Sequence, residues 1–360
     1  MDKNITALRL AALRELIGSH DTDAALISLY ENRRYYTGFT GSNGYVIITR
    51  ESVTLITDRR YTQQAEQQTW DVRIVEHGAD RFALIAGEIA ALRINSLLLE
   101  SAMPVTEYFE LKRRLPDVRM ELAEETLLDI RMVKDETEIA DIQKAIRLSE
   151  QALSEVAACC KSGMTEKDIA DELNYRVSRS GADAMSFGTI VAAGERGALA
   201  HGTPTKRPIR SGEMVVVDFG AMWNGYCADL TRTLLFGDVP QERLDTFEVV
   251  ERAFQTAFAT VHPGVIAAEV DEAHRQVFRD AGMEEYALKG LGHGIGLEIH
   301  EHPRVVIAGR HELKPGMVFT IEPGLYLPGR YGVRTEDDVL VTQDGAINLC
   351  SLPHRILITS

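Results

Sequence analysis

Cysteine is rare in this chain, with four residues among 360, and none of them belongs to a CxxC pair. Cys159 and Cys160 are neighbours in the sequence, which disfavours a disulfide between them. A chain of this length buries a sizeable core without covalent cross-links. The sequence therefore predicts a protein with reduced thiols that works in the cytoplasm.

Long apolar runs are also missing from the sequence. No segment approaches the ~20 apolar residues of a membrane-spanning helix, and residues 1–20 lack the continuous apolar stretch of a signal peptide. Basic residues number 39 against 54 acidic ones, for a formal net charge of −15. We expect neither nucleic acid nor an anionic membrane as a partner, because both select for basic patches.

Short apolar segments alternate with helical patterns over residues 1–128. Residues 4–18 have the spacing of an amphipathic helix. Further helices are expected near 61–69, 80–92 and 105–114, and strands near 24–29, 45–49, 53–57, 72–76 and 96–100. This alternation predicts an α/β domain over residues 1–128. A long helix should follow, starting at a capping box of Asp135 and Glu138 and ending before Gly163.

Residues 129–360 contain a weak internal repeat. The segment 163–181 resembles 264–282, and segment 211–220 aligns with 315–324 without gaps. His201 aligns in the same way with His300. Chance similarity between helix-and-glycine patterns is the alternative, but the ordered succession of matches favours duplication. Two facing halves would place equivalent residues around one shared centre.

Two acidic residues flank a predicted β-hairpin whose turn is Asn224-Gly225, a dipeptide that favours tight turns. In that register Asp218 faces Thr231, and Asp218 and Asp229 are diagonal neighbours ~7–8 Å apart at Cα. Side chains at this separation can converge on a pair of metal ions ~3.5–4 Å apart. The alternative is two ordinary hairpin carboxylates, one exposed and one paired with Arg232.

The second half adds two more acids, since Glu322 and Glu336 occupy the positions that Asp218 and Asp229 occupy in the first. Four carboxylates in one pocket raise one another's pKa strongly unless cations neutralise them. His293 supplies an imidazole from a glycine-rich loop. Oxygen ligands suit manganese, magnesium or cobalt, and one imidazole widens the choice to zinc. Two further histidines, His302 and His311, are expected at the surface.

These residues lie in stretches that resemble the metallopeptidases of the pita-bread fold, which include methionine aminopeptidase, prolidase and Xaa-Pro aminopeptidase. The matching stretches are SFGTIVAAGERGALAHGTP, VVVDFGAMWNGYCADLTRTLLFG, GHGIGLEIHEHP, TIEPGLYLPG and GVRTEDDVLVT. The resemblance implies an α+β pita-bread catalytic domain over residues 129–360 with an internal pseudo-two-fold duplication. It also implies two divalent ions, with manganese favoured over cobalt or zinc, held by Asp218, Asp229, His293, Glu322 and Glu336.

Residues 1–128 resemble the N-terminal domain of the creatinase and prolidase type through NRRYYTGFTGSNGYVIIT and TDRRYTQQAEQ. Methionine aminopeptidases lack that domain, so the resemblance implies an Xaa-Pro aminopeptidase acting on small peptides with proline at the second position. In relatives the domain helps to form a homodimer and narrows the active-site cleft. This sequence departs from the family pattern at Gly188, Ala200 and Lys289, where proline-specific relatives commonly carry an acid, a proline and a histidine.

The resemblance also implies roles for the side chains around the metals. Glu322 is expected to take a proton from the attacking water and to pass it to the leaving nitrogen. His300 is expected to donate a hydrogen bond to the developing oxyanion. The remaining assignments place His201 against the peptide after the scissile bond, and Arg334 against Glu336 or Asp218.

Other functions stay open at this point. An Xaa-Pro dipeptidase, or prolidase, must recognise a free carboxylate near the metals, and no basic residue is assigned to that task from sequence. A catalytically silent binding protein is disfavoured, because all five metal ligands are present. Hydrolysis of a non-peptide bond, as in creatinase, is disfavoured because creatinase-like chains do not keep the metal set. A metal-bearing hydrolase of another amide has its best support in Lys289.

Overall fold

The structure, a computed structural model, describes residues 3–123 and 126–359. The chain divides into two compact units, Met1–Ile130 and Arg131–Ser360. Each unit has its own sheets and its own buried apolar cluster. None of the helices described combines the length and the hydropathy that crossing a membrane requires.

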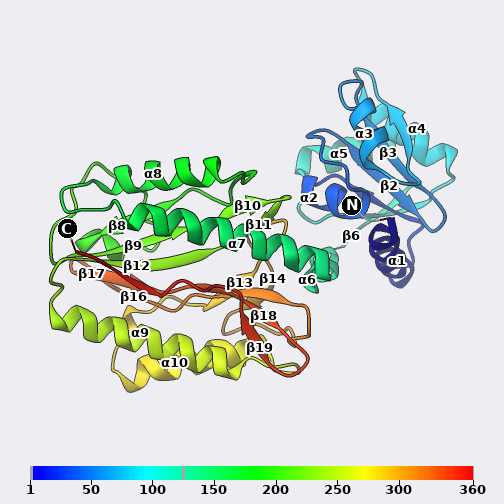
Figure 1. Ribbon diagram of the computed structural model, residues 1–360. Coiled ribbons are helices and arrows are strands. Elements are labelled where there is room, and N and C mark those ends of the chain that lie inside the picture. Colours follow the sequence, from blue (N-terminus) through cyan, green and yellow to red (C-terminus); the bar gives the residue numbers. More distant parts are fainter. Residues whose placement is uncertain (1–2, 124–125, 360) are drawn as a thin grey trace. The chain divides into compact units, whose positions relative to one another are not determined.

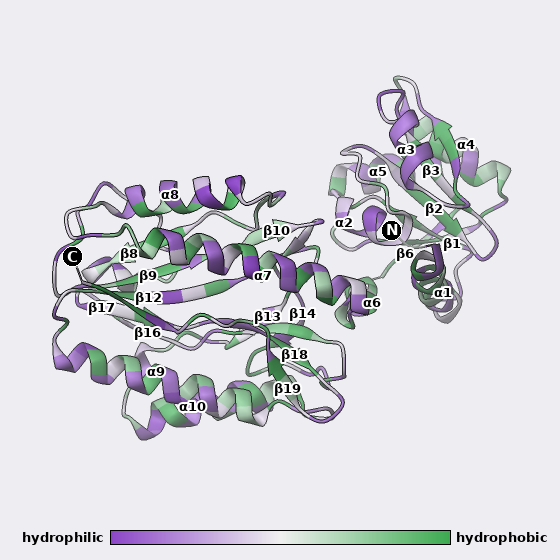
Figure 2. Ribbon diagram, in the orientation of Figure 1, coloured by the Kyte–Doolittle hydropathy of each residue, from purple (hydrophilic) through white to green (hydrophobic). Residues whose placement is uncertain are grey.

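The first unit is built on a mixed sheet with the strand order β4-β3-β2-β1-β5-β6. Its central strands β1, β2 and β3 pair antiparallel, and the outer strands are added in parallel. Figure 2 shows β2 and β3 as predominantly hydrophobic segments. The strands are β1 (Ala24–Ile27), β2 (Tyr45–Thr49), β3 (Val53–Thr57), β4 (Arg73–Glu76), β5 (Ser96–Leu99) and β6 (Arg119–Leu122), and the helices are α1 (Lys3–Ser19), α2 (Tyr30–Thr37), α3 (Thr62–Gln68), α4 (Arg81–Ala91) and α5 (Val105–Arg114). The predicted α/β architecture is confirmed.

The second unit places strands between two pairs of helices, with α7 and α8 on one side and α9 and α10 on the other (Figure 1). After α6 (Thr126–Met132), its long helices are α7 (Glu136–Ala157), α8 (Glu166–Arg179), α9 (Gln241–Thr260) and α10 (Ala267–Asp280), and its 3-10 turns are η1 (Gly194–Ala198) and η2 (Glu284–Tyr286). The strands of the first half are β7 (Ala184–Met185), β8 (Ile190–Ala193), β9 (Met214–Phe219), β10 (Ala221–Trp223), β11 (Tyr226–Cys227) and β12 (Leu230–Phe236). The strands of the second half are β13 (Gly292–Gly294), β14 (Glu301–Val305), β15 (Val318–Ile321), β16 (Gly324–Leu327), β17 (Tyr331–Arg334), β18 (Asp337–Val341) and β19 (Ala346–Asn348), followed by β20 (Arg355–Ile358), which joins the sheet of β12.

The two halves of this unit repeat one helical motif. Helices α8 and α10 are each 14 residues long. The glycine before each helix, Gly163 or Gly264, has φ of 95° or 90°, and the glycine after it, Gly181 or Gly282, has φ of 91° or 66°. Such positive φ angles favour glycine at all four positions. The internal duplication and the α+β pita-bread architecture are therefore confirmed.

The capping box at the start of α7 is also confirmed. Asp135 Oδ1 accepts the backbone N–H of Glu138 at 3.0 Å, and Glu138 Oε2 accepts the backbone N–H of Asp135 at 3.0 Å. The other oxygen of Glu138 accepts the hydroxyl of Tyr226 at 2.9 Å. The cap thus ties α7 to the β10–β11 hairpin as well as starting the helix.

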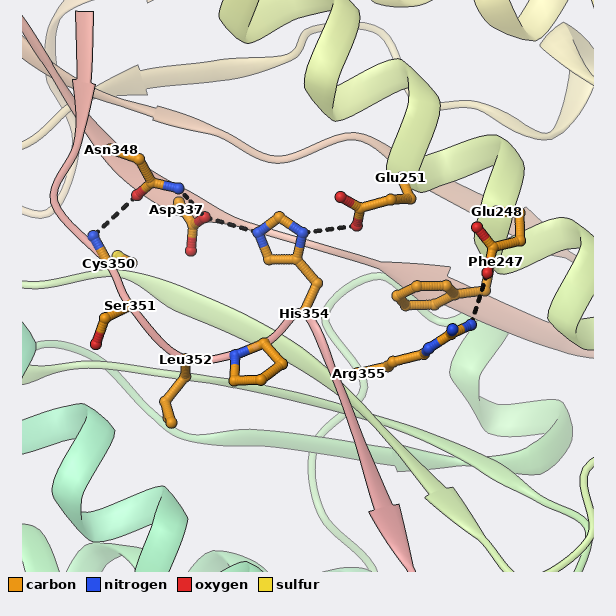
Figure 3. Close-up of a pocket in the computed structure, with 11 residues that line it drawn as sticks. Phe247, Glu248, Glu251, Asp337, Asn348, Cys350, Ser351, Leu352, His354 and Arg355 are labelled. Carbon is orange, nitrogen blue, oxygen red and sulfur yellow. Dashed lines mark hydrogen bonds and ion pairs between the residues drawn. The ribbon is translucent and has the colours of Figure 1, made fainter.

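A polar network holds the C-terminal segment against α9 and β18, beside a cavity of about 380 Å³ (Figure 3). His354 lies between two carboxylates, with Nδ1 2.7 Å from Glu251 and Nε2 2.7 Å from Asp337. Burial alone would lower the pKa of His354, but the hydrogen-bonded carboxylates raise it to about 9. Asp337 also accepts Arg232 at 2.8 Å and Asn348 at 2.5 Å. His354 is therefore a charged link from the C-terminal segment to α9 and β18.

Replacing this imidazolium gives a pH-dependent loss of stability. Because the folded pKa exceeds the unfolded value of ~6.5, the stabilisation is complete below pH ~6.5 and is lost as the pH rises through about 9. We expect His354→Gln to lower the free energy of unfolding by about 2–3 kcal/mol at pH 6 and by much less at pH 9.5. Urea titrations at both pH values measure this difference, with the exposed His262→Gln as the control. An equal loss at the two pH values would contradict the charged state of His354.

Candidate metal centre

Asp218 and Asp229 are held by one long hairpin. Strand β9 pairs antiparallel with β12 so that Asp218 lies opposite Thr231, and the turn residues Asn224 and Gly225 have φ of 45° and 70°. The expected register is confirmed. Both acids are buried, at 7 % and 5 % exposure. The alternative of one exposed acid and one paired with Arg232 is wrong, because the buried Arg232 pairs with Asp337 instead.

The second half presents Glu322 and Glu336 from an equivalent pair of strands. Strand β15 pairs with β18 through Ile321 and Asp337, so each glutamate lies one residue beyond the last pair. An isolated bridge between Thr231 and Glu336 joins the two halves. The hydroxyl of Thr231 also donates to Glu336 Oε2 at 2.6 Å. Residues 105 positions apart in the chain are thereby fixed beside each other.

His293 approaches these acids from β13. Its Nδ1 lies 3.1 Å from the carbonyl oxygen of Gly294, which directs Nε2 towards the carboxylates. Nε2 is 3.7 Å from Asp229 Oδ2 and 3.4 Å from Glu322 Oε1. Ligand atoms of Asp229, His293 and Glu336 all lie within 4.8 Å of one another. A Cβ on the preceding Gly292 would stand 2.0 Å from a backbone oxygen of β15, so only glycine permits this close approach.

Arg334 is a buried link behind the acids. Its Nη2 donates to Asp218 Oδ2, its Nε donates to Thr231 Oγ1 at 3.0 Å, and its Nη1 donates to the hydroxyl of Tyr326 at 2.9 Å. Of the two positions expected for Arg334, the structure shows the one against Asp218. Arg334 reaches Glu336 only through Thr231. Sequence reasoning missed the part played by Thr231 and Tyr326, although the hairpin register already placed Thr231 opposite Asp218.

The predicted catalytic histidines line the same cavity, which has a volume of about 410 Å³. The rings of His300 and His293 are nearly perpendicular, at 84°, with centroids 4.3 Å apart. The cavity lining comprises Asp218, Asp229, His293, Glu322, Glu336, His201 and His300, together with Phe187, Gly188, Thr189, Ile190, Thr203 and Ile299. The structure therefore brings every predicted metal ligand and both histidines into one pocket.

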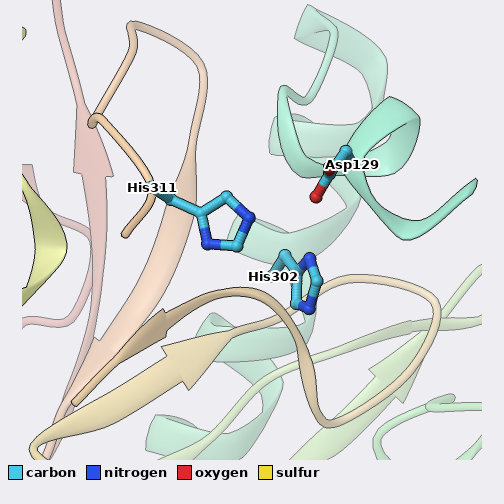
Figure 4. Close-up of side chains that lie close together, drawn as sticks. All are labelled: Asp129, His302 and His311. Carbon is cyan, nitrogen blue, oxygen red and sulfur yellow. The ribbon is translucent and has the colours of Figure 1, made fainter. Parts of the chain in front are cut away.

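One histidine differs from its expected position. His302 is only 3 % exposed, although we expected it at the surface. It lies on β14, which packs against α10, and its ring centroid is 4.6 Å from that of His311 (Figure 4). The burial follows from strand packing, which a short HEHP segment does not indicate by its own pattern.

Without a cation, burial and mutual repulsion favour the protonated form of the acids in the pocket. Burial raises the pKa of Asp229 and of Glu336 well above the usual range, and the neighbouring carboxylates raise both further. Burial likewise raises the pKa of Glu322 to about 7, against the lowering effect of Arg334. The Oδ1 atoms of Asp218 and Asp229 are buried and have no hydrogen-bond partner among the residues described.

This donor set fits divalent ions. Buried carboxylate oxygens without partners require a cation. Burial lowers the pKa of His293 to about 3, so its imidazole is neutral, which is the form that binds metals. Four carboxylates and one imidazole offer enough donor atoms for two ions at the spacing of a dinuclear hydrolase site.

Comparison with known proteins gives the family. Residues 140–343 match metallopeptidase family M24, and residues 9–133 match the creatinase/prolidase N-terminal domain. The Xaa-Pro dipeptidase of Pyrococcus horikoshii is 33 % identical over 345 residues, which are 95 % of this chain and 97 % of that protein. The structure of an X-Pro aminopeptidase from Thermotoga maritima MSB8 superposes with a TM-score of 0.88 at 36 % identity, covering 94 % of this chain and 98 % of that one. An Xaa-Pro dipeptidase from Bacillus anthracis gives 0.95 at 32 % identity, with coverage of 99 % and 100 %.

The chain belongs to metallopeptidase family M24. The resemblance inferred from its motifs is confirmed, as are the N-terminal domain type and the enzyme class of metallopeptidase.

Because the acids repel one another, replacing one of them should change the Tm in opposite directions in the metal-free and the metal-loaded protein. Because the folded pKa of Asp229 is raised, the metal-free protein loses stability as the pH rises above the unfolded pKa of ~4. We expect Asp229→Asn to raise the Tm of EDTA-treated protein at pH 8 by roughly 2–4 °C, and to lower the Tm of manganese-loaded protein. Thermal unfolding with EDTA or manganese tests both signs, with the exposed Asp238→Asn as the control. A lower Tm in both states would show that repulsion among the acids does not control the stability of the metal-free protein.

Proposed function

We propose that this chain is an Xaa-Pro aminopeptidase with two divalent metal ions, which releases an N-terminal residue from a following proline. The observation that carries this proposal is the convergence of five side chains of metal-ligand type with two further histidines in one pocket. The proposed ligands are Asp218, Asp229, His293, Glu322 and Glu336. Relatives described as an Xaa-Pro dipeptidase and an X-Pro aminopeptidase support the substrate class.

The donor set favours a hard metal. Carboxylate oxygens select manganese first, and the single imidazole also permits cobalt or zinc. When bound by these residues, such ions would supply a water nucleophile near neutral pH and electrophilic assistance at the scissile carbonyl. The buried, low-dielectric pocket strengthens each of these electrostatic effects.

The protein's own side chains would complete the reaction. The proposed proton carrier is Glu322, which accepts a hydrogen bond from the Thr320 hydroxyl at 3.3 Å; it would take the proton of the attacking water and deliver it to the proline nitrogen. His300 faces the pocket and donates a hydrogen bond to the developing oxyanion. His201, on the exposed side of the pocket, contacts the peptide after the scissile bond. Arg334 holds Asp218 in its ligand position.

The setting of the enzyme is part of the same proposal. We propose a cytoplasmic homodimer that acts on small peptides with proline second, and not on nucleic acid or membranes. The free thiols of Cys159 and Cys350 support a reducing compartment. Val105 and Phe109, which lie one turn apart on α5, are 66 % and 64 % exposed and offer an apolar contact surface for a dimer. The N-terminal domain is proposed to form that contact and to shape the cleft.

A peptide panel tests the activity. With manganese bound, we expect cleavage of Leu-Pro-Leu after its first residue, at a kcat/KM about 10²-fold above that of Leu-Ala-Leu. EDTA should abolish the reaction, and manganese should restore it. Product analysis by mass spectrometry reads out both peptides in parallel. Cleavage of the alanine peptide alone would refute the proline assignment.

One observation favours Xaa-Pro dipeptidase as a second candidate. Arg304 lies opposite His293 in the β13–β14 pair and has an exposed side chain. Its charge is close enough to lower the pKa of both His293 and His300, beyond the larger lowering due to burial. A cation at this position suits the free carboxylate of a dipeptide. A dipeptidase needs such a basic residue, and the sequence alone did not identify one.

Arg304→Ala separates the two candidates. If the chain acts as a dipeptidase, the variant should raise KM for Leu-Pro at least about tenfold, because a charge-assisted hydrogen bond to the carboxylate is lost. KM for Leu-Pro-Leu should change far less. The exposed Arg310→Ala is the matched control. Equal KM changes for both peptides would remove Arg304 from carboxylate recognition and favour the aminopeptidase.

A further inference from the structure

A cluster of buried charges lies directly behind His300. Arg131, Lys134 and Glu301 are 2 %, 4 % and 1 % exposed. Lys134 Nζ is 3.0 Å from Glu301 Oε2. Arg131 Nη2 pairs with Glu301 Oε1 and also lies 2.8 Å from Glu298 Oε2. Glu301 is adjacent to His300 in the chain, so any movement of its carboxylate acts on the residue that faces the pocket.

The carboxylate of Glu301 also shapes the turn that leads to His300. Glu301 Oε1 accepts the backbone N–H of Glu298 at 3.1 Å. A Cβ on Gly296 would stand 2.6 Å from Glu301 Oε2, so the carboxylate occupies the inside of the turn. The carbonyl of Gly296 accepts the backbone N–H of Cys227 at 2.8 Å, which anchors the turn on the first-half hairpin. The turn is thus fixed from within by one carboxylate.

Electrostatics keep that carboxylate ionised. Burial alone would raise the pKa of Glu301, but Lys134 and Arg131 lower it to about 2. Burial lowers the pKa of Arg131, and the charges of Glu301 and Glu298 more than reverse that effect. Neutralising Glu301 would therefore leave two buried cations without their main partner, and the turn would have to rearrange.

The cluster is separate from the site described above. Arg131 and Lys134 precede the residues that match family M24, and neither they nor Glu301 are among the described residues that line the pocket. Glu301 connects the cluster to the pocket through the Gly296–Glu301 turn, and it also pairs with Gly294, the residue after His293. The ring of His300 is held nearly perpendicular to that of His293 at the end of this turn.

We propose that Arg131, Lys134 and Glu301 are positioning residues that hold the Gly296–Glu301 turn so that His300 faces the substrate carbonyl. This inference rests on the proposed role of His300 in the peptidase reaction. An oxyanion donor is effective only when it is preorganised, because reorientation during the reaction would cost part of its electrostatic stabilisation. If the cluster only stabilised the fold, its loss would act on His300 no more than on any other part of the site.

A double-mutant cycle distinguishes the two possibilities. His300→Ala is expected to lower kcat for Leu-Pro-Leu by ~10²–10³. Glu301→Gln, which keeps the side-chain shape, is expected to lower kcat by about 10–100-fold, with KM within about threefold. In the His300→Ala background, Glu301→Gln should change kcat by no more than about twofold, because its effect passes through His300. Equal fold-losses in both backgrounds overturn the proposal.

The position of His300 can also be tested without substrate, by a measurement that does not depend on catalytic activity. In metal-free protein with ¹⁵N-labelled histidine, the ring signals of His300 are assigned through His300→Ala. Glu301→Gln and the milder Lys134→Gln should both shift these signals and leave those of the exposed His262 unchanged. Unchanged His300 signals in Lys134→Gln, the variant that keeps Arg131 paired with Glu301, overturn the proposal even if Glu301→Gln does not fold.

Metal binding distinguishes an effect on His300 from an effect on His293, which lies three residues before the Gly296–Glu301 turn. Calorimetric titration with manganese should give the same stoichiometry for Glu301→Gln as for the parent, with affinity within about threefold. A loss of manganese affinity as large as the loss of kcat would assign the effect to His293 and overturn the assignment to His300.

A second buried ion pair provides the matched control. Asp271 and Arg275 on α10 are 0 % and 7 % exposed, with Oδ2 and Nε 2.8 Å apart, and neither lines the pocket described. Asp271→Asn should lower the Tm but leave kcat within about twofold; a kcat loss equal to that of Glu301→Gln overturns the proposal. If the parent enzyme cleaves no Xaa-Pro peptide, the proposed function fails, while the histidine signals still decide the positioning role.

Discussion

Four carboxylates meet in one pocket and repel one another, and the catalytic domain is organised around that repulsion. Asp218, Asp229 and Glu336 are almost fully buried, and Glu322 is partly exposed beside them, so the like charges interact strongly. Within the described ranges, Arg334 is the one cationic side chain that pairs with this set directly, through Asp218. It cannot balance four acids, so divalent ions are required for all of them to be ionised together. The need for cations agrees with the metallopeptidase family to which the chain belongs.

Duplication is the means by which the chain assembles so many acids in one place. One β-hairpin offers two acids on one face, and more like charges on a single hairpin would destabilise it. Two halves facing each other double the number of acids without crowding either hairpin. The hydrogen bond from Thr231 to Glu336 then connects the halves at the site itself. Because the proposed metal ligands come from both halves, we expect metal binding to be coupled to the packing of the halves.

A second layer of ion pairs surrounds the centre without entering it. Asp337, the first residue of β18, follows Glu336 directly and is held by Arg232 and His354. Glu301, the first residue of β14, follows His300 directly and is held by Arg131 and Lys134. Glu336 and His300 thus each have a neighbour in sequence that is anchored by buried cations. In both places the residue just before a strand lines the pocket, and the first residue of the strand is fixed by ion pairs.

Local sequence was sufficient for the features that depend on local backbone preference or on spacing. The capping box of Asp135, the Asn224-Gly225 turn and the register that sets Asp218 opposite Thr231 follow from such preferences. Family motifs named the five candidate ligands. Tertiary structure decided the contacts that join distant segments: Arg334 with Asp218, Arg131 with Glu301, and the burial of His302. A charged residue carries no local sign of its partner, because ion pairing depends on which segments the fold brings together.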